Sequence, residues 1–265
     1  MRVGLPVTGR PVLIPADDPV AVEATRVVQA GDLDALDRLL REQPELATAR
    51  LGDPDCSRTL LLAAADWPGH FPNGPAVVRA LVAAGADVGT RFVGGHTETP
   101  LHWAASSDDV AVLDALLDLG ADIEADGAVL GGGTAMADAC GFGNWAAARR
   151  LVERGARTRL KDAAALGLMD RVVAAFAEGA PPPSAEQVTW ALWSACHGGR
   201  RAAAEYLIDR GADVDWVGWD DLTPLDVALK AADNPENPDG PAASEAADLV
   251  AWLRSRGART AADQP

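Results

Sequence analysis

Histidine and aspartate side chains give this chain its best candidates for proton transfer. Three of the four histidines fall between positions 70 and 102, beside a loop at 66–75. Histidine titrates near neutral pH, and a neighbouring carboxylate can orient it, so such a cluster is a candidate general acid–base site. The candidate catalytic residues, which would act on a small molecule bound under this loop, are Asp66, His70, His96, His102 and Asp138.

Other reactive residues lack the spacing that their chemistry needs. Cys196 and His197 are adjacent, and adjacent residues of a helix point about 100° apart and do not face each other. Cys140 and Cys196 occupy the same position of a repeated pattern, where a small buried residue is expected. With no His-x-x-x-His pair and no close cysteine pair, the sequence predicts no metal ion and no cofactor. It favours a binding protein over an enzyme, with the pocket at 66–75 as the alternative.

The charge balance excludes several classes of partner. The 265 residues are 48% hydrophobic and include 23 Lys or Arg against 39 Asp or Glu, a formal charge of −16. Such an acidic chain repels phosphate backbones and anionic lipid, so neither nucleic acid nor a membrane is expected as a partner. The apolar runs are far shorter than a bilayer span. Three widely spaced cysteines and the absence of an apolar signal segment predict reduced thiols and a cytoplasmic location.

Two repeated phrases predict the elements that position these side chains. Gly-Ala-Asp recurs at 85–87, 120–122 and 211–213, each time after a short helix with apolar residues three and four positions apart. Upstream lie Thr-Pro-Leu-His-Trp-Ala-Ala at 99–105 and Thr-Pro-Leu-Asp-Val-Ala at 223–228. Thr is expected to cap the following helix and Pro to occupy its first turn, while the Gly ends the next helix.

These phrases together resemble the ankyrin repeat, and the resemblance extends over nearly the whole chain. It implies an all-α solenoid of about seven helix-turn-helix units with β-hairpin or loop fingers. Another helical-pair solenoid is disfavoured because both phrases are present. We expect an N-terminal extended segment at 1–21 and a single repeat domain at 22–260. The units would start near residues 22, 59, 99, 134, 158, 190 and 223.

The pattern is interrupted at four places. The segment 66–75 holds three prolines, two glycines and the aromatic residues Trp67 and Phe71, which predicts an inserted loop between two helices. The spacings from Gly85 to Thr99 and from Gly120 to Thr134 are two residues longer than the ordinary spacing, and the unit beginning near 158 is short.

The resemblance also implies a binding face, formed by the fingers and the exposed edge of each first helix. The binding residues that it predicts are Trp67, Phe92, His96, Trp103, Ser106, Asp138, Phe142, His197, Trp216 and Trp219. Trp is enriched at interface hot spots, but it also fills cores. For Trp67, Trp103, Trp216 and Trp219 both roles stay open, whereas Trp145, Trp190 and Trp252 are assigned to the core. At His102, a structural hydrogen bond is favoured over catalysis.

An acidic, Trp-rich concave face suits a cationic partner, because carboxylates attract it at long range and aromatic faces add cation–π contacts. We therefore expect an interaction module or scaffold that binds another protein, one with a basic surface. Two alternatives stay open. One is a small cationic molecule, and the other is a masking role in which the acidic face covers a basic toxin or enzyme.

Overall fold

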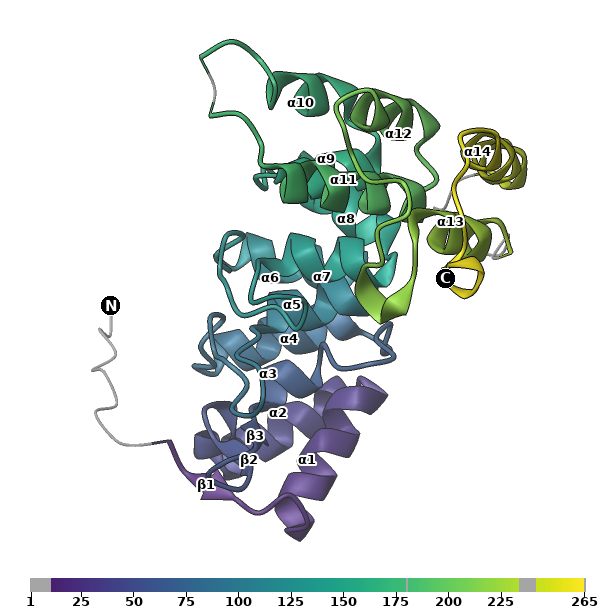
Figure 1. Cartoon of the computed structure of the whole chain (residues 1–265). Helices are drawn as coiled ribbons and strands as arrows, with labels where there is room; N and C mark the ends of the chain where they lie inside the picture. The colour runs from purple at the N-terminus through teal and green to yellow at the C-terminus, as the bar shows by residue number, and fades with distance from the viewer. Residues whose placement is uncertain (1–10, 180, 234–241, 265) are drawn as a thin grey trace. The chain divides into compact units, whose positions relative to one another are not determined.

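A computed structural model describes residues 11–179, 181–233 and 242–264. The chain divides into two compact units, Met1–Ala135 (unit 1) and Met136–Pro265 (unit 2). Both units consist mainly of paired helices (Figure 1), which confirms the predicted all-α repeat fold. The predicted single domain, its unit starts and the extended segment at 1–21 stay predictions, and residues 1–10 of that segment lie outside the described residues.

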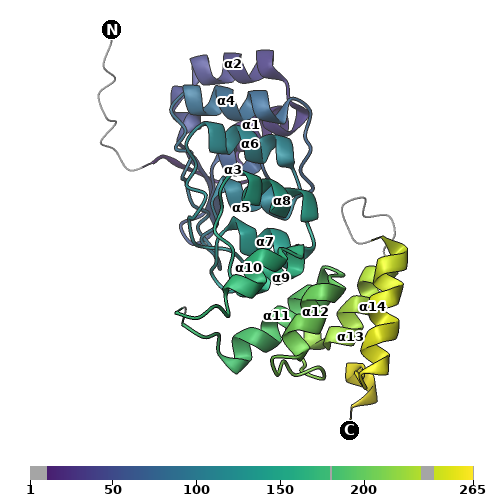
Figure 2. The ribbon, with the colours of Figure 1, turned by 90° about the horizontal axis from the view of Figure 1, so that it is seen from above.

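Unit 1 contains three helix pairs in two rows. The first helices, α1, α3 and α5, form one row, and the second helices, α2, α4 and α6, form the other (Figures 1 and 2). The helices are α1 (Pro19–Ala30), α2 (Leu33–Glu42), α3 (Leu60–Ala63), α4 (Gly74–Ala83), α5 (Pro100–Ser106) and α6 (Val110–Asp118), with a short 3-10 helix η1 (Pro44–Ala47).

A small sheet covers the finger side of unit 1. Strand β1 (Leu13–Ile14) pairs in parallel with β2 (Arg50–Gly52), which pairs antiparallel with β3 (Ser57–Arg58). An isolated bridge joins Ser57 to Val93 and connects this sheet to the next finger. The two fingers of unit 1, residues 86–98 (finger A) and 121–133 (finger B), are otherwise loops rather than regular hairpins.

Unit 2 repeats the helix-pair arrangement with shorter connections. Its helices are α7 (Ala135–Phe142), α8 (Trp145–Glu153), α9 (Leu160–Leu166), α10 (Met169–Ala174), α11 (Ala185–His197), α12 (Arg201–Ile208), α13 (Pro224–Ala232) and α14 (Ala243–Ser255), with 3-10 turns η2 (Trp219–Asp221) and η3 (Ala261–Asp263). Helices α9, α11 and α13 pack successively against one another. The connection 154–159 before α9 is short, as the repeat spacing predicts, and α11 begins more than a turn before Trp190.

The repeated phrases form these helices as expected. Thr99 and Thr223 are the N-caps of α5 and α13, each followed by Pro in the first turn. The apolar stripes behind them are buried: Leu101 and Leu225 lie in the cores of their own units, and Leu116 of α6 is fully buried. Cys140 and Cys196 are also buried, as expected for small core residues. Each unit thus has a packed interior that holds its fingers in place.

Candidate functional site

The finger side of unit 1 carries an aromatic pair, Phe92 of finger A and Trp103 of α5. The ring centroids lie 5.5 Å apart with a tilt of 49° between the planes. Both side chains are half-buried, so each ring packs on one face and stays accessible at its edge. Trp103 reaches this position because the Thr99 cap begins α5 and directs the fourth helical residue toward the finger.

Two arginines tie the backbone of these fingers together. Arg50 Nη2 donates to the carbonyl oxygens of Ser57 at 2.7 Å and of Arg91 at 2.9 Å. Arg91 in turn donates through Nη1 to the carbonyls of Thr97 and Asp126, and through Nη2 to the Asp126 carboxylate at 2.8 Å. We call this series the arginine clamp. It links the hairpin at β2–β3 to finger A and finger A to finger B, so the finger side of unit 1 is braced rather than loose.

His102 lies beneath the fingers and has a structural role. Its side chain is 0% exposed. Nδ1 accepts the Thr99 backbone N–H at 3.2 Å, which completes a capping box, and Nε2 lies 3.3 Å from the Gly133 carbonyl. These contacts assign the proton to Nε2. Burial lowers the pKa of His102 to about 4, so the ring is neutral at pH 7 and is enclosed rather than open to a substrate.

The loop 66–75 places a tryptophan in solvent on a fixed backbone. Trp67 is 79% exposed. Asp66 forms an ion pair with Arg58, and the His70 backbone N–H donates to the Asp109 carboxylate at 2.7 Å. Asn73 Nδ2 donates to the Gly31 carbonyl at 3.0 Å. The loop therefore contacts the turns between the helices of the neighbouring pairs, α1–α2 and α5–α6, while its indole projects away from the protein.

Gly31 is the contact that keeps this loop in place. Gly31 has a φ of +65°, and a Cβ added there would lie 1.8 Å from the Pro72 carbonyl oxygen. We expect Gly31→Ala to displace the loop and lower the free energy of unfolding of unit 1 by about 2–4 kcal/mol, since it combines left-handed strain with a steric clash. Gly132→Ala is the matched control, because Gly132 of finger B has a φ of +67° but nothing within 4 Å of an added Cβ. Urea denaturation should show a loss of about 1 kcal/mol for Gly132→Ala. Equal losses for the two variants would contradict the clash.

The finger side of unit 2 is built around a tryptophan cluster, Trp190 and Trp193 of α11 with Trp216. The ring centroids of Trp190 lie 4.7 Å from Trp216 and 6.2 Å from Trp193, both in edge-on geometry. Trp193 Nε1 donates to the Leu222 carbonyl at 2.9 Å, which satisfies the buried indole N–H. Next to the cluster, the exposed side chains of Val217 and Trp219 extend toward solvent. This surface combines a fixed aromatic base with apolar groups that have no cover among the described residues.

His197 at the end of α11 lies between two indoles. Its ring centroid is 5.3 Å from that of Trp145 and 5.4 Å from that of Trp193. Nε2 is buried and has no hydrogen-bond partner among the described residues. Burial lowers the pKa of His197, so the neutral ring is favoured. This environment suits a packing residue better than a surface contact.

The family model described as ankyrin repeats (three copies) matches residues 24–127 and 71–162, which together make up more than half of the chain. The chain belongs to the ankyrin repeat family. The crystal structure of the human ASB11 ankyrin repeat domain is similar at 20% identity, with 85% of this chain and 96% of that chain covered and a TM-score of 0.48. No curated protein matches the chain.

Within this ankyrin repeat protein, the predicted binding residues differ widely in exposure. Trp67, Phe142 and Trp219 are exposed, at 79%, 49% and 50%. Five of the predicted residues are half-buried: Phe92, Trp103, Ser106, His197 and Trp216. His96 of finger A is exposed. Asp138 is 0% exposed, so its carboxylate lies inside unit 2. Trp67, Phe142 and Trp219 are therefore the exposed Trp and Phe residues of this set.

The alternative catalytic pocket receives no support from these positions. His70 lies in the loop that contacts the helix turns, whereas His96 lies in finger A, and both side chains point into solvent. His102 is buried inside unit 1, and Asp66 forms an ion pair with Arg58. Asp138 belongs to unit 2. Among the described residues, no group of three or more His, Cys, Asp or Glu side chains could hold a metal ion.

A pocket on the finger side of unit 2 involves two residues that the sequence analysis did not select, Lys161 and Trp190. It has a volume of about 340 Å³ and is lined by Arg159, Leu160, Lys161, Glu186, Gln187 and Trp190. The Lys161 ammonium lies 5.5 Å from the Trp190 ring centroid. The sequence carries a signal for this pocket, because a lysine follows Leu160 where the repeat pattern has leucine in Thr-Pro-Leu.

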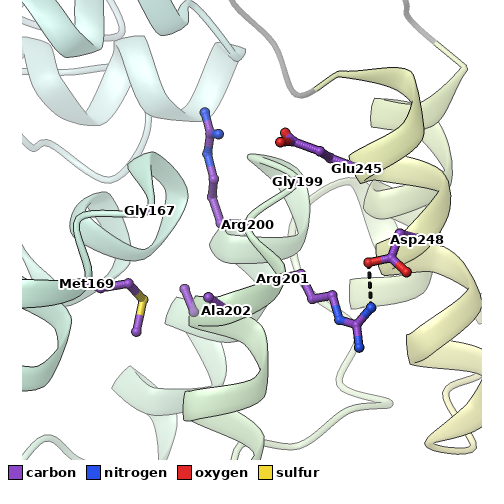
Figure 3. A pocket seen from close by; sticks show the side chains of 9 residues that line it. Gly167, Met169, Gly199, Arg200, Arg201, Ala202, Glu245 and Asp248 are labelled. Atoms are coloured by element: carbon purple, nitrogen blue, oxygen red, sulfur yellow. Dashed lines mark hydrogen bonds and ion pairs between the residues drawn. The ribbon is translucent and has the colours of Figure 1, made fainter.

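A second pocket of unit 2 lies where α12 begins and faces α14. Figure 3 shows Arg200 and Arg201 within it, with Arg201 paired to Asp248 and Glu245 across from Arg200. Its volume is about 280 Å³. Arg201 is neutralised by Asp248 and Glu205, and Arg200 Nε donates to the Ala165 carbonyl at 3.3 Å. These contacts hold the α11–α12 turn against its neighbours, which is a structural task.

Over the ranges 11–179, 181–233 and 242–264, none of the helices has both the length and the apolar character that crossing a bilayer requires.

Proposed function

We propose that this ankyrin repeat protein binds a partner protein through exposed aromatic anchors, with Trp67 as the principal one. Ankyrin repeats are in general protein–protein interaction modules. The observation that carries the proposal is the 79% exposure of the Trp67 indole on a loop held by contacts at Asp66, His70 and Asn73. Trp219 in unit 2 and Phe142 on α7 would add contacts on their own unit.

The fixed loop supports an anchor role on energetic grounds. Exposing a large indole to water costs free energy. In a flexible loop, the indole would instead pack back onto the surface of the protein. Because the loop backbone is already ordered, a partner that buries Trp67 loses little additional conformational entropy in this protein. Interface hot spots are typically such pre-ordered aromatic side chains. The arginine clamp supports the same conclusion for the fingers.

Charge supports a partner with a basic surface. Unit 1 contains nine arginines and no lysine against twenty Asp and Glu residues, a formal charge of −11. At physiological salt, the attraction acts over about 8 Å and mainly raises the rate of association. We place the protein in the cytoplasm, where its three free cysteines would stay reduced. We also infer one repeat domain at 22–260 with the unit starts predicted from the spacing.

Affinity capture followed by a binding measurement tests this proposal. Wild type, Trp67→Ala and the control Val173→Ala serve as baits in a lysate of the source cells. Val173, which is 46% exposed, is an apolar surface residue on α10, the second helix of its pair, and lies outside the fingers. We expect one protein to be retained by wild type and by Val173→Ala, and its purified form to bind Trp67→Ala about 10–100-fold more weakly in calorimetry.

Unchanged affinity of the purified partner for Trp67→Ala would overturn the anchor role of this residue. A partner whose affinity does not fall when the salt concentration is raised would contradict the basic surface proposed for it. Retention of a small molecule and no protein would favour the alternative that the sequence left open, a cationic ligand.

A further inference from the structure

Lys161 occupies a position that is a core leucine in other repeats. The second residues of α3, α5 and α13 are Leu61, Leu101 and Leu225, and each is buried. The second residue of α9 is Lys161. A leucine would pack there without desolvating a charge, whereas the lysine places an ammonium at the edge of the pocket. The chain has 21 arginines and two lysines, Lys161 and Lys230, which makes this lysine more unusual still.

The Lys161 ammonium faces a pocket and forms no direct ion pair among the described residues. The carboxylates of Asp162 and Asp138 attract it over a longer distance, and its nitrogen lies 5.5 Å from the centroid of the Trp190 ring. The pocket of about 340 Å³ lies where α9 and α11 begin, the helix ends from which the fingers project. The aliphatic stem of Lys161 is half-buried, and burial lowers the pKa of its amine.

Besides Lys161, the charged residues that line this pocket are Arg159 and Glu186. Arg159 is engaged by Asp162, whose Oδ2 accepts the Arg159 backbone N–H at 2.9 Å and Nε at 3.4 Å. Asp162 is buried beneath the helix start rather than in the pocket. Glu186 lines the pocket but is exposed, and Gln187 uses its carbonyl oxygen to accept the Ser184 N–H. The pocket therefore presents the Lys161 ammonium, the Trp190 ring and the Gln187 side-chain amide, together with the exposed Glu186 carboxylate.

We propose that this pocket, the Lys161 pocket, binds the carboxylate of an acidic side chain in a peptide segment of the partner protein. The carboxylate would accept hydrogen bonds from the Lys161 ammonium and the Gln187 amide, while an adjacent apolar side chain packs on Trp190. The inference rests on the proposed function, because it names the chemistry that a partner presents to unit 2. A pocket that offers an ammonium group in an acidic protein would fix the register of a partner that is basic elsewhere.

Lysine-selective NMR tests the pocket without the partner. Protein labelled with ¹³C at the lysine side chains gives signals for two lysines, and the exposed Lys230 of α13 is an internal control. The probe is the acetylated, amidated dipeptide leucyl-glutamate, and leucyl-glutamine is its uncharged counterpart. We expect the Lys161 signal to shift and saturate with the glutamate probe while Lys230 moves little. The glutamine probe should bind at least about tenfold more weakly, since it lacks the charge-assisted hydrogen bond.

Two variants separate binding from folding. Lys161→Met should fold as well as wild type, because Met136 is buried at the same position of α7, and it should lose the probe. Lys161→Arg should retain it. For both variants, binding is followed at the Trp190 indole N–H, assigned from the spectrum of Trp190→Phe.

Equal, linear shifts of Lys161 and Lys230 would overturn the pocket, as would equal binding of the two dipeptides or binding that persists in Lys161→Met. Such a result would leave partner binding through Trp67 in place. Trp67 lies in unit 1, so Trp67→Ala should not alter the dipeptide titration. The capture experiment therefore tests the proposed function, and the dipeptide titration tests the Lys161 pocket.

Discussion

Replacing Leu116 by alanine is expected to lower the free energy of unfolding by about 2–5 kcal/mol. Leu116 is fully buried on α6, and α6 packs against both α4 and α5, so truncation leaves a cavity that three helices line. Each pair of helices in a repeat protein is stabilised mainly by its neighbours, so the loss should extend to α4 and α5. Urea denaturation measures the change, and amide hydrogen exchange shows whether α4 and α5 are also less protected.

Leu33→Ala is the control for this experiment. Leu33 starts α2 in the same unit and is 37% exposed. Its replacement removes less buried area, and we expect a loss below about 1 kcal/mol. Similar losses for the two variants would contradict the burial of Leu116, and faster exchange confined to α6 would contradict the coupling between neighbouring pairs.

Acid is expected to destabilise unit 1 through His102. The pKa of this ring is about 4 in the folded protein and about 6.5 in an unfolded chain. Because folding lowers the pKa, the stabilising contribution is fully present above pH 6.5 and is lost as the pH falls toward 4. At about 1.4 kcal/mol per pH unit, the loss between pH 7.5 and pH 4.5 is about 2–3 kcal/mol. Protonated Nδ1 also cannot accept the Thr99 N–H.

His102→Gln isolates this effect. Glutamine at the third helical position can accept the N-cap N–H in a capping box, and it does not titrate. Urea denaturation of wild type and variant at the two pH values gives a double difference in which all other titrating groups, including His197, cancel. We expect the variant to lose about 2–3 kcal/mol less than wild type. Equal acid sensitivity would show that His102 is not the group that responds to pH.

The repeat scaffold of this chain could be predicted because its signals are local. Thr99 and Pro100 begin a helix by their own backbone and side-chain preferences, and Leu101 follows from the apolar period. A structural role for His102 is also predictable from the repeat pattern, because its contacts with Thr99 and Gly133 belong to the repeat itself. These features need no knowledge of distant contacts.

The candidate site depends on contacts that the sequence does not display. The loop 66–75 was recognised from its prolines and glycines, but its contacts with Gly31 and Asp109 join residues about forty positions apart. Its attachment to the helix turns, away from finger A, is why His70 and His96 do not form one site. The sequence places Trp190 in the core, because a tryptophan in a helix does not reveal which part of its ring is accessible to a pocket. Lys161 was detectable by comparing units position by position.

The arginine clamp has a consequence for anyone who redesigns this protein as a binder. Libraries of repeat proteins usually vary finger residues as if each finger were independent. Here Arg91 is at once the acceptor of Arg50, through its carbonyl, and the donor to Asp126 of the next finger. Varying Arg91 would therefore change the positions of the β2–β3 hairpin, finger A and finger B. A gain in affinity in a selected variant could then come from this movement as well as from new contacts. Randomisation is better confined to exposed positions such as His96, with Arg50, Arg91 and Asp126 held constant.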